Sequence, residues 1–394
     1  MKRCTRCLLP ETHETIRFDA NGVCSICLNF DQKNLIDWEL KRNQLEEILS
    51  KHRGIGDYDC IIPFSGGKDS VFTLLYAVKN LHLKPLVVSF DHGFYRPNLL
   101  EGRNRVLKNL GVDFLSFTPD WRLVRVLMLK SFLEKGDFCW HCHTGIFSYP
   151  LWIAIEKNIP LVLWGEPSSE YTSYYDYSDV ELVDEVRFNR IVNLGISALD
   201  MRARLDNSFE ERAFKPFTFP DVKKLKSLGV VSVPLGSFIP WNVPAQVERI
   251  KSELGWTGDS VEGVPPEYDY EKVECYMQGV RDYIKYLKRG YARTTHLTSL
   301  DIRNGKKTRE ESLQLVSEFE GKVPYSLSLF LEYTGLSESE FMEVVDKHKL
   351  LEEMNRPLLQ IGKKPPDFDE LFKHPAMPKS DSKTMLTQWR EENS

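Results

Sequence analysis

Short apolar runs alternate with helical patterns along the middle of the chain. Mostly apolar runs predict β-strands at residues 58–64, 85–90, 114–117 and 161–164. Apolar positions at helical spacing predict helices at residues 70–80, 98–110, 121–134 and 146–157. This alternation is typical of right-handed βαβ units, and strands that are apolar throughout are typical of a sheet covered on both faces. The pattern therefore predicts an α/β fold with a doubly wound parallel sheet.

Both ends of the chain differ from this alternation. Residues 31–53 have apolar side chains at helical spacing and predict a connecting helix. Beyond about residue 255, helices are predicted at residues 267–289, 310–318 and 337–347, with Ser337 as a cap, and the last 30 residues form a polar tail. We expect a cysteine ribbon over residues 1–30, an α/β domain over 31–255 and a helical region over 256–394.

The composition excludes several classes of protein. Of 394 residues, 42% are hydrophobic and 28% are charged, which excludes a mainly disordered chain. The net charge of −5 gives no overall basic field, so we expect no nucleic-acid partner. No run approaches the roughly 18 apolar residues of a membrane span, and the start MKRCTRC lacks the apolar run of a signal peptide. We therefore expect a cytoplasmic protein.

Four of the eight cysteines lie in the first 27 residues. Cys4 and Cys7 form one CxxC pair, Cys24 and Cys27 form another, and 16 residues separate the two pairs. Two such pairs can supply four thiolates to one tetrahedral zinc ion. Because all four ligands would be cysteine, no coordination position is open. We therefore expect structural zinc, with metal binding contributing to the folding of the ribbon.

The segment FSGGKDS follows a predicted strand and begins a predicted helix. Its polar and glycine positions are Ser65, Gly66, Gly67, Lys68, Asp69 and Ser70. The glycines let the backbone approach an anion, and N–H groups at a helix N-terminus bind phosphate. The serines add hydroxyl donors, the lysine adds a cation, and the aspartate fits beside phosphates through Mg²⁺. The segment is neither a Walker A loop nor a dinucleotide-binding GxGxxG.

Over residues 58–165 the chain resembles the PP-loop ATP pyrophosphatases, the adenine nucleotide alpha-hydrolase-like family. Two further segments, FDHG with Phe90 and Asp91 and WGE with Gly165 and Glu166, follow predicted strands. The resemblance implies that ATP is cleaved to AMP and pyrophosphate while a carbonyl oxygen is adenylylated. It also implies that Lys68, Asp69 and Asp91 are catalytic. The FSGGKDS positions, Phe90, Gly165 and Glu166 would bind ATP.

The whole chain resembles the N-acetyl sugar amidotransferases of bacterial surface-polysaccharide biosynthesis. The similar segments are RCTRCLLPET, NGVCSIC, FSGGKDS, SFDHGF, FCWHCHTGIF and RGYARTTHLTSLDIRNGKKTREESLQLV. The resemblance implies an ATP-dependent carbon–nitrogen ligase that converts a sugar's acetamido group to an acetamidino group, in pathways such as that of the lipopolysaccharide O-antigen. Adenylylation would turn the amide oxygen into a good leaving group, which ammonia then displaces.

The sequence offers no glutaminase of its own. An N-terminal-nucleophile glutaminase needs cysteine directly after Met1, and this chain has Lys2. A GxCxG nucleophile setting is absent around Cys60, Cys139 and Cys275. Ammonia is therefore expected from a separate subunit. The resemblance implies a partner similar to the glutaminase and cyclase subunits of histidine biosynthesis.

The second cysteine motif leaves several interpretations open. Cys139 and Cys142 flank Trp140 and His141 in a CWHCH run. They could form a second metal site, line the substrate pocket, or mark a kink before a helix. They also favour an alternative function, a PP-loop tRNA sulfurtransferase, which the negative charge and the lack of an RNA-binding module oppose. A non-enzymatic nucleotide sensor is a third reading, opposed by the intact FSGGKDS loop.

Overall fold

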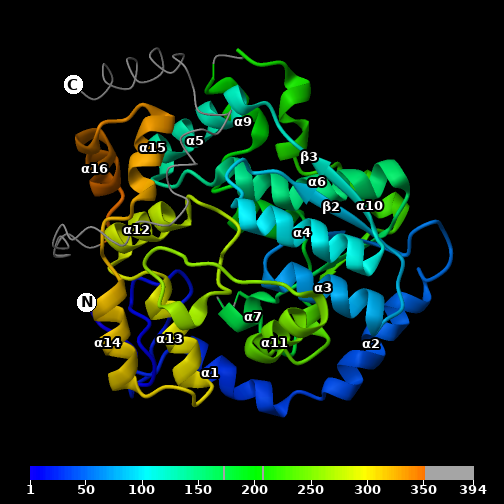
Figure 1. Cartoon of the computed structure of the whole chain (residues 1–394), viewed down its shortest axis with the longest axis horizontal. Helices are drawn as coiled ribbons and strands as arrows, with labels where there is room; N and C mark the ends of the chain where they lie inside the picture. Colours follow the sequence, from blue (N-terminus) through cyan, green and yellow to red (C-terminus); the bar gives the residue numbers. More distant parts are fainter. Residues whose placement is uncertain (172–173, 206–207, 351–394) are drawn as a thin grey trace. The chain divides into compact units, whose positions relative to one another are not determined.

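The structure is a computed structural model that describes residues 1–171, 174–205 and 208–350 (Figure 1). The chain divides into two compact units. The sheet unit consists of Leu28–Pro119 and Trp140–Asp259; the helical unit consists of Met1–Cys27, Asp120–Cys139 and the chain from Ser260 onward. The polar tail expected at the C-terminus lies outside the described residues.

The sheet unit contains one parallel sheet of five strands in the order β3-β2-β1-β4-β5. The strands are β1 (Cys60–Pro63), β2 (Pro85–Phe90), β3 (Asp113–Phe117), β4 (Leu161–Trp164) and β5 (Val231–Pro234). Ile61 of the central strand pairs with Leu86 on one side and Val162 on the other. Four strands lie where the apolar runs predict them. The fifth strand was not predicted.

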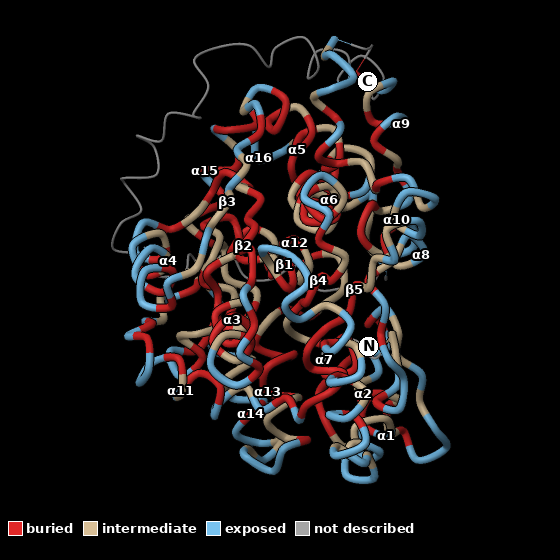
Figure 2. Tube along the Cα trace, turned by 90° about the vertical axis from the view of Figure 1, so that its right-hand side faces the viewer, coloured by how far each residue is buried: buried red, intermediate tan, exposed pale blue. Residues whose placement is uncertain are grey.

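Helices cover both faces of this sheet (Figure 2). One face carries α3 (Lys68–Lys79), α4 (Pro97–Leu110) and α11 (Val243–Leu254), and the other carries α6 (Trp140–Lys157) and α10 (Val222–Leu228). The predicted doubly wound fold is confirmed. The chain direction across the sheet reverses between β1 and β4, and in such sheets ligands bind beyond the carboxyl ends of the strands at this switch point.

Helix α6 begins six residues before the helix expected at residues 146–157. Its first turns contain polar side chains that are nevertheless buried, including His141, Thr144 and Ser148. The Thr144 hydroxyl donates to the Trp140 carbonyl oxygen at 2.7 Å, and the Ser148 hydroxyl donates to that of Thr144 at 2.6 Å. These bonds allow hydroxyl groups to be buried. The apolar pattern therefore did not reveal this part of the helix.

The helical unit has an aromatic core. Its helices are α5 (Trp121–Lys135), α12 (Gln278–Arg289), α13 (Arg293–Arg303), α14 (Arg309–Phe319), α15 (Ser326–Thr334) and α16 (Glu338–Lys347). The Phe132 ring of α5 lies 5.3 Å from the rings of Phe330 and Phe341. This packing places α5 with the C-terminal helices, although the sequence analysis assigned it to the α/β domain. The Ser337 cap is present, with a reciprocal bond from Glu340.

Two predicted helices have different bounds in the structure. The helix expected at residues 31–53 corresponds to α2 (Trp38–Ser50), which starts later because Asp37 caps it by accepting from the Glu39 and Leu40 amides. The preceding α1 (Ser25–Gln32) was not predicted. The helix expected at 267–289 begins only at Gln278. The remaining short helices are α7 (Ser168–Tyr171), α8 (Glu185–Arg187) and α9 (Ala198–Ala203). Among the described residues, no helix is both long enough and apolar enough to cross a bilayer.

Candidate active site and metal centre

The predicted phosphate loop connects β1 to α3 at the switch point. Gly66 has φ +88°, a conformation that favours glycine, and Gly67 caps the helix. The Ser70 hydroxyl accepts from the Gly66 amide at 3.1 Å and donates to the Gly67 carbonyl oxygen at 3.0 Å. The Ser65 hydroxyl accepts from the Gly67 amide at 3.2 Å. In this structure both serines therefore stabilise the loop itself.

The two charged residues of the loop form an ion pair at the first turn of α3. Lys68 Nζ lies 2.7 Å from Asp69 Oδ2, and the side chains are 4% and 17% exposed. Burial of the ammonium group requires such a partner. The pair places one cation and one carboxylate beside the helix N-terminus, as phosphate binding with Mg²⁺ requires.

Gly165, at the end of β4, packs directly against α3. A β-carbon at Gly165 would lie 2.9 Å from the Thr73 hydroxyl oxygen and 3.2 Å from the Asp69 carbonyl oxygen. The structure thus brings the predicted WGE segment to the phosphate loop. Burial lowers the pKa of Arg187, and the nearby Glu166 carboxylate opposes this shift. Glu166 therefore lies close enough to Arg187 to interact with it electrostatically.

Phe90 and Asp91 follow β2 but have different environments. The Phe90 ring is buried, 5.6 Å from the Phe217 ring and 5.9 Å from the Phe117 ring. This ring is therefore part of the core, and its role in ATP binding stays a prediction. Asp91 is half-buried and accepts from the Gly93 amide at 2.9 Å and from the Thr118 hydroxyl at 3.2 Å. Its carboxylate lies at the edge where ligands bind.

Sequence reasoning missed a tryptophan that supports the loop. Trp256 Nε1 donates a hydrogen bond to the Gly66 carbonyl oxygen at 3.0 Å, across 190 positions of sequence. Trp256 is buried and follows α11. A single tryptophan after a helix has no distinctive local pattern, so the sequence contained no signal for this contact.

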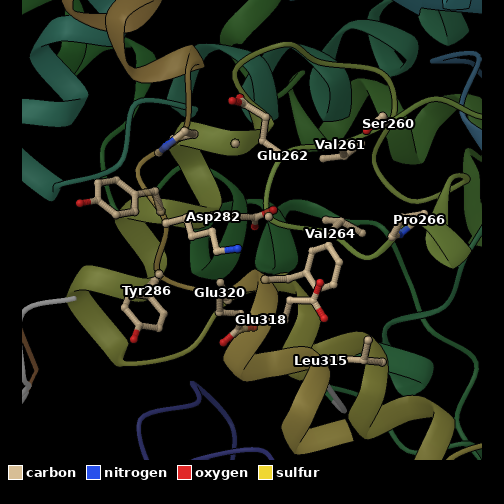
Figure 3. Close-up of a pocket in the computed structure, with 18 of the residues that line it drawn as sticks. Ser260, Val261, Glu262, Val264, Pro266, Asp282, Tyr286, Leu315, Glu318 and Glu320 are labelled. Carbon is tan, nitrogen blue, oxygen red and sulfur yellow. The ribbon is translucent and has the colours of Figure 1, made fainter. Parts of the chain in front are cut away.

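The helical unit contains a cavity of about 680 Å³ (Figure 3). Carboxylates of Asp282, Glu318 and Glu320 surround it, together with the Tyr286 ring. Asp282 pairs with Arg293 at 3.3 Å, and Glu320 accepts from the Thr295 amide and hydroxyl. Asp282 and Glu320 therefore both have partners within the protein.

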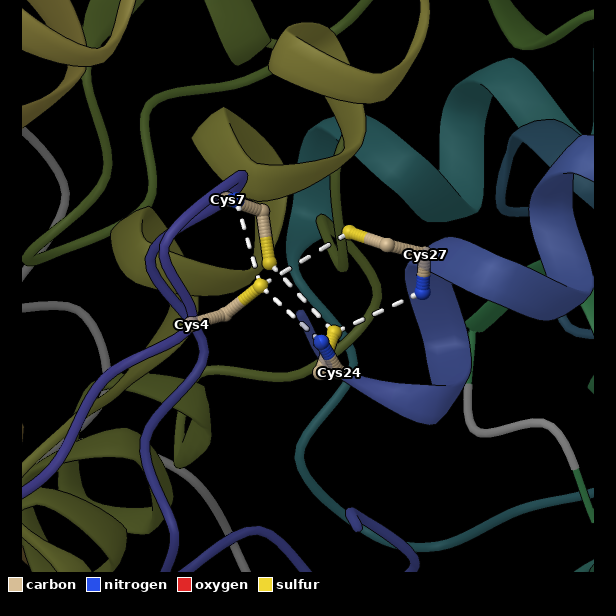
Figure 4. A group of neighbouring side chains, drawn as sticks. All are labelled: Cys4, Cys7, Cys24 and Cys27. Atoms are coloured by element: carbon tan, nitrogen blue, oxygen red, sulfur yellow. Dashed lines mark hydrogen bonds between the residues drawn. The ribbon is translucent and has the colours of Figure 1, made fainter. Parts of the chain in front are cut away.

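The four N-terminal cysteines converge at one point (Figure 4). All are buried, and their sulfur atoms lie within 4.8 Å of one another. The Cys4–Cys27 and Cys7–Cys24 sulfur distances are 4.0 and 3.8 Å. A tetrahedral zinc ion with bonds of ~2.3 Å needs sulfur atoms roughly 3.8 Å apart. The donor set and its spacing therefore fit zinc, and the four-cysteine cluster of the predicted ribbon is confirmed.

The second cysteine motif does not join such a cluster. Cys139 is buried, Cys142 is half-buried, and both thiols are free of disulfides. Within the described part of the chain, the one group of three or more suitable ligands is the N-terminal set. His141 Nε2 lies 3.3 Å from the His92 carbonyl oxygen, so the first turn of α6 approaches the segment after β2.

Comparisons with known proteins give three partial similarities. A stretch of 122 residues is 32% identical to uncharacterized protein MJ1599 of Methanocaldococcus jannaschii, covering 30% of this chain and 43% of that protein. The chain thus spans less than half the length of this relative. The U34-tRNA thiolase NcsA from Methanococcus maripaludis, with its [4Fe-4S] cluster, aligns over 90% of this chain and 99% of its own. The identity is 13% and the TM-score 0.31, too low to support an argument.

A family model identifies the C-terminal part. Residues 267–391 match the family described as LPS biosynthesis protein WbpG-like, C-terminal domain. The helices α12 to α16 lie within this match, and its last 41 positions, 351–391, lie outside the described residues. The chain is thus similar to WbpG-like lipopolysaccharide biosynthesis proteins over its C-terminal third.

Proposed function

We propose that this protein is an ATP-dependent amidotransferase that converts the acetamido group of a sugar to an acetamidino group. The product would enter the lipopolysaccharide O-antigen or a related surface glycan. The observation that carries the proposal is the FSGGKDS loop at the switch point, in a chain with a WbpG-like C-terminal domain. The loop supports ATP chemistry, and the domain supports a glycan pathway.

The proposed reaction has two steps. The amide oxygen of the sugar attacks the α-phosphorus of ATP, and pyrophosphate leaves. Ammonia then adds to the imidate carbon, and AMP leaves with the former amide oxygen. The loop amides and Lys68 would bind the phosphates and stabilise the charge that develops on them. The carboxylates of Asp69 and Asp91 would hold Mg²⁺, which when bound neutralises phosphate charge.

The ammonia would come from a separate glutaminase subunit, with a cyclase-like subunit alongside it. Support comes from the sequence, where Cys60, Cys139 and Cys275 lack the GxCxG setting of a glutaminase nucleophile. We expect ammonium salts to sustain the reaction of the purified chain and glutamine alone to leave it inactive. Equal use of glutamine by the purified chain would contradict a separate glutaminase.

The decisive experiment identifies the product. The protein is incubated with ATP, ammonium and a set of free and nucleotide-linked acetamido sugars, followed by mass spectrometry. Replacement of oxygen by NH makes the sugar lighter by about one mass unit and adds an amidinium charge that changes its electrophoretic mobility. AMP and pyrophosphate should appear in equal amounts. ADP as the main nucleotide product would refute the proposal.

The alternative is a tRNA sulfurtransferase that uses Cys139 and Cys142. Its support is that neither thiol is in a disulfide, and that Cys139 directly precedes α6 while Cys142 lies in its first turn. A thiolated nucleotide would be heavier by the difference between sulfur and oxygen and would gain no positive charge. Thiolated tRNA, with no amidino sugar from any acetamido acceptor, would favour this alternative.

A further inference from the structure

Two side chains beside the phosphate loop, the half-buried Arg103 and the buried His92, have buried N–H donors without acceptors. Arg103 Nε and Nη1 and His92 Nε2 are buried and have no hydrogen-bond partner among the residues that the structure describes. A buried donor without an acceptor is costly, and a buried cation more so. Polar groups of this kind call for an explanation, and a ligand that supplies acceptors is one.

Arg103 lies against the phosphate loop. A β-carbon at Gly66 would lie 3.4 Å from the Arg103 β-carbon and 3.5 Å from its γ-carbon, so the stem of the arginine packs on the loop. Arg103 comes from α4, on the face of the sheet that α3 also covers. The arginine is therefore a neighbour of the segment that would bind phosphates.

The guanidinium group is held by aromatic rings. Its central carbon lies 5.2 Å from the Tyr95 ring centre and 5.1 Å from the Phe114 ring centre. Such contacts orient a guanidinium without using its N–H groups. The N–H groups of Nε and Nη1 therefore stay available for a second, hydrogen-bonded interaction.

His92 contacts the same tyrosine and lies within electrostatic range of Arg103. Its ring centre is 4.1 Å from that of Tyr95, and its Nδ1 accepts from the Phe94 amide at 3.3 Å. An accepting Nδ1 leaves the proton of the neutral ring on Nε2. Burial lowers the pKa of His92 to about 4, with Asp91 opposing and His141 and Arg103 adding to the effect. His92 is thus a neutral donor at pH 7.

We propose that Arg103 and His92 form an anion subsite next to the phosphate loop, which binds phosphate oxygens. The subsite offers several donors and a positive charge, and the atoms in question need acceptors. Arginine's planar fork suits phosphate oxygens better than a single donor would. The phosphate belongs to ATP or to the diphosphate of a nucleotide-linked sugar. The inference rests on the proposed function only for the identity of these two sources.

The test replaces Arg103 with methionine, which keeps the stem and the contacts with the rings but removes the charge. Binding of inorganic pyrophosphate, AMP and UDP is measured by calorimetry, and the thermal midpoint is measured with and without each. The matched control is Arg105→Met on the same helix, since Arg105 is exposed and donates to the Gly255 carbonyl oxygen.

For Arg103→Met we expect the affinity for pyrophosphate, for UDP or for both to fall at least about tenfold, as for one lost charge-assisted pair. The ligand-free midpoint should be unchanged or higher, because two buried donors without acceptors are removed. A purely structural arginine would give the opposite pattern, a lower midpoint with unchanged binding, and that result would overturn the proposal. A loss confined to pyrophosphate identifies ATP as the source, and a loss confined to UDP identifies the sugar nucleotide.

Arg103→Lys keeps the positive charge but replaces the planar guanidinium, with its several N–H donors, by a single ammonium group. We expect it to bind pyrophosphate more weakly than the parent and more tightly than Arg103→Met. If the methionine variant fails to fold, parental affinity of the lysine variant for both pyrophosphate and UDP overturns the proposal, and weakened affinity for either supports it. These measurements need no acceptor sugar. Failure of the amidotransferase assay would therefore leave the subsite standing, and failure of the subsite would leave that assay unaffected.

Discussion

Arg309 donates a hydrogen bond from Nη1 to the backbone carbonyl oxygen of Cys4 at 2.9 Å. The same nitrogen contacts the carbonyl oxygen of Cys7, so one guanidinium connects α14 to both residues of the first cysteine pair. Nearby, the Leu8 amide donates to the Ser299 hydroxyl of α13 at 3.1 Å. The cysteine ribbon is therefore joined to the C-terminal helices by hydrogen bonds. Metal binding should stabilise those helices as well as the ribbon itself.

Zinc removal should destabilise the helical unit. We expect about one zinc per chain, and Cys24→Ser should lower the zinc content and reduce the Tm by roughly 10 °C, because the metal contributes folding free energy. Elemental analysis and calorimetry provide the measurements. Cys275→Ser, a half-buried cysteine outside the cluster, is the control and should keep both values. Full stability of zinc-free protein would exclude a structural metal.

Loss of either loop charge should slow AMP formation. Lys68→Ala and Asp69→Asn should each reduce turnover by roughly 10²-fold, as expected when transition-state charge stabilisation is lost. Turnover is followed by pyrophosphate release. Lys79→Ala changes an exposed lysine at the far end of the same helix and should leave the rate within about twofold. Equal effects of Lys79→Ala and Lys68→Ala would mean that the loop is not the ATP site.

Gly145 of α6 should not tolerate a methyl group. A β-carbon there would lie 2.3 Å from Cζ of the Phe90 ring, so Gly145→Ala should lower the unfolding free energy by about 1–3 kcal/mol. Phe90→Leu should relieve part of this cost, which a double-mutant cycle in urea would measure. Gly102→Ala, also in a helix, meets no atom closer than 3.8 Å and should be neutral or slightly stabilising. Additive effects of Gly145→Ala and Phe90→Leu on the unfolding free energy would exclude direct contact between these two residues.

Acid should destabilise the protein through His13. Burial lowers the pKa of His13 from 6.5 to about 4, with Glu14 opposing and nearby cations adding to the shift. Below about pH 6.5, His13 binds a proton in the unfolded chain but stays neutral in the folded chain. The free energy of unfolding therefore falls as the pH drops from 6.5 towards about 4. The loss attributable to this residue is on the order of 3 kcal/mol.

His13→Gln should reduce the slope of unfolding free energy against pH in this window, measured by urea denaturation. His82→Asn replaces an exposed histidine that has positive φ, a conformation asparagine accepts, and should keep the parental slope. Identical slopes for the parent and His13→Gln would contradict a buried neutral histidine.

The sequence by itself determined the features that depend on local pattern. Strands β1 to β4 are short, mostly apolar runs, and the glycines and charges of residues 64–70 are adjacent in the chain, so both were predictable. The four ribbon cysteines were predictable for the same reason, because zinc ligation requires paired thiolates at short spacing. Glu166 and Asp91 were placed only as far as the ends of their strands, where parallel strands bring them to one edge of the sheet.

Only the tertiary structure decided which side chains meet across long sequence separations. It put the Phe90 ring into the core, turned the Ser65 and Ser70 hydroxyls onto their own loop, and brought Trp256 to Gly66. It also packed α5 against the C-terminal helices and placed Arg103 beside the loop with unpaired donors. The physical reason is that a pattern reports only whether a position is polar or apolar. Which atoms satisfy a buried hydrogen bond, or fill the space beside a glycine, depends on segments that approach one another only after folding.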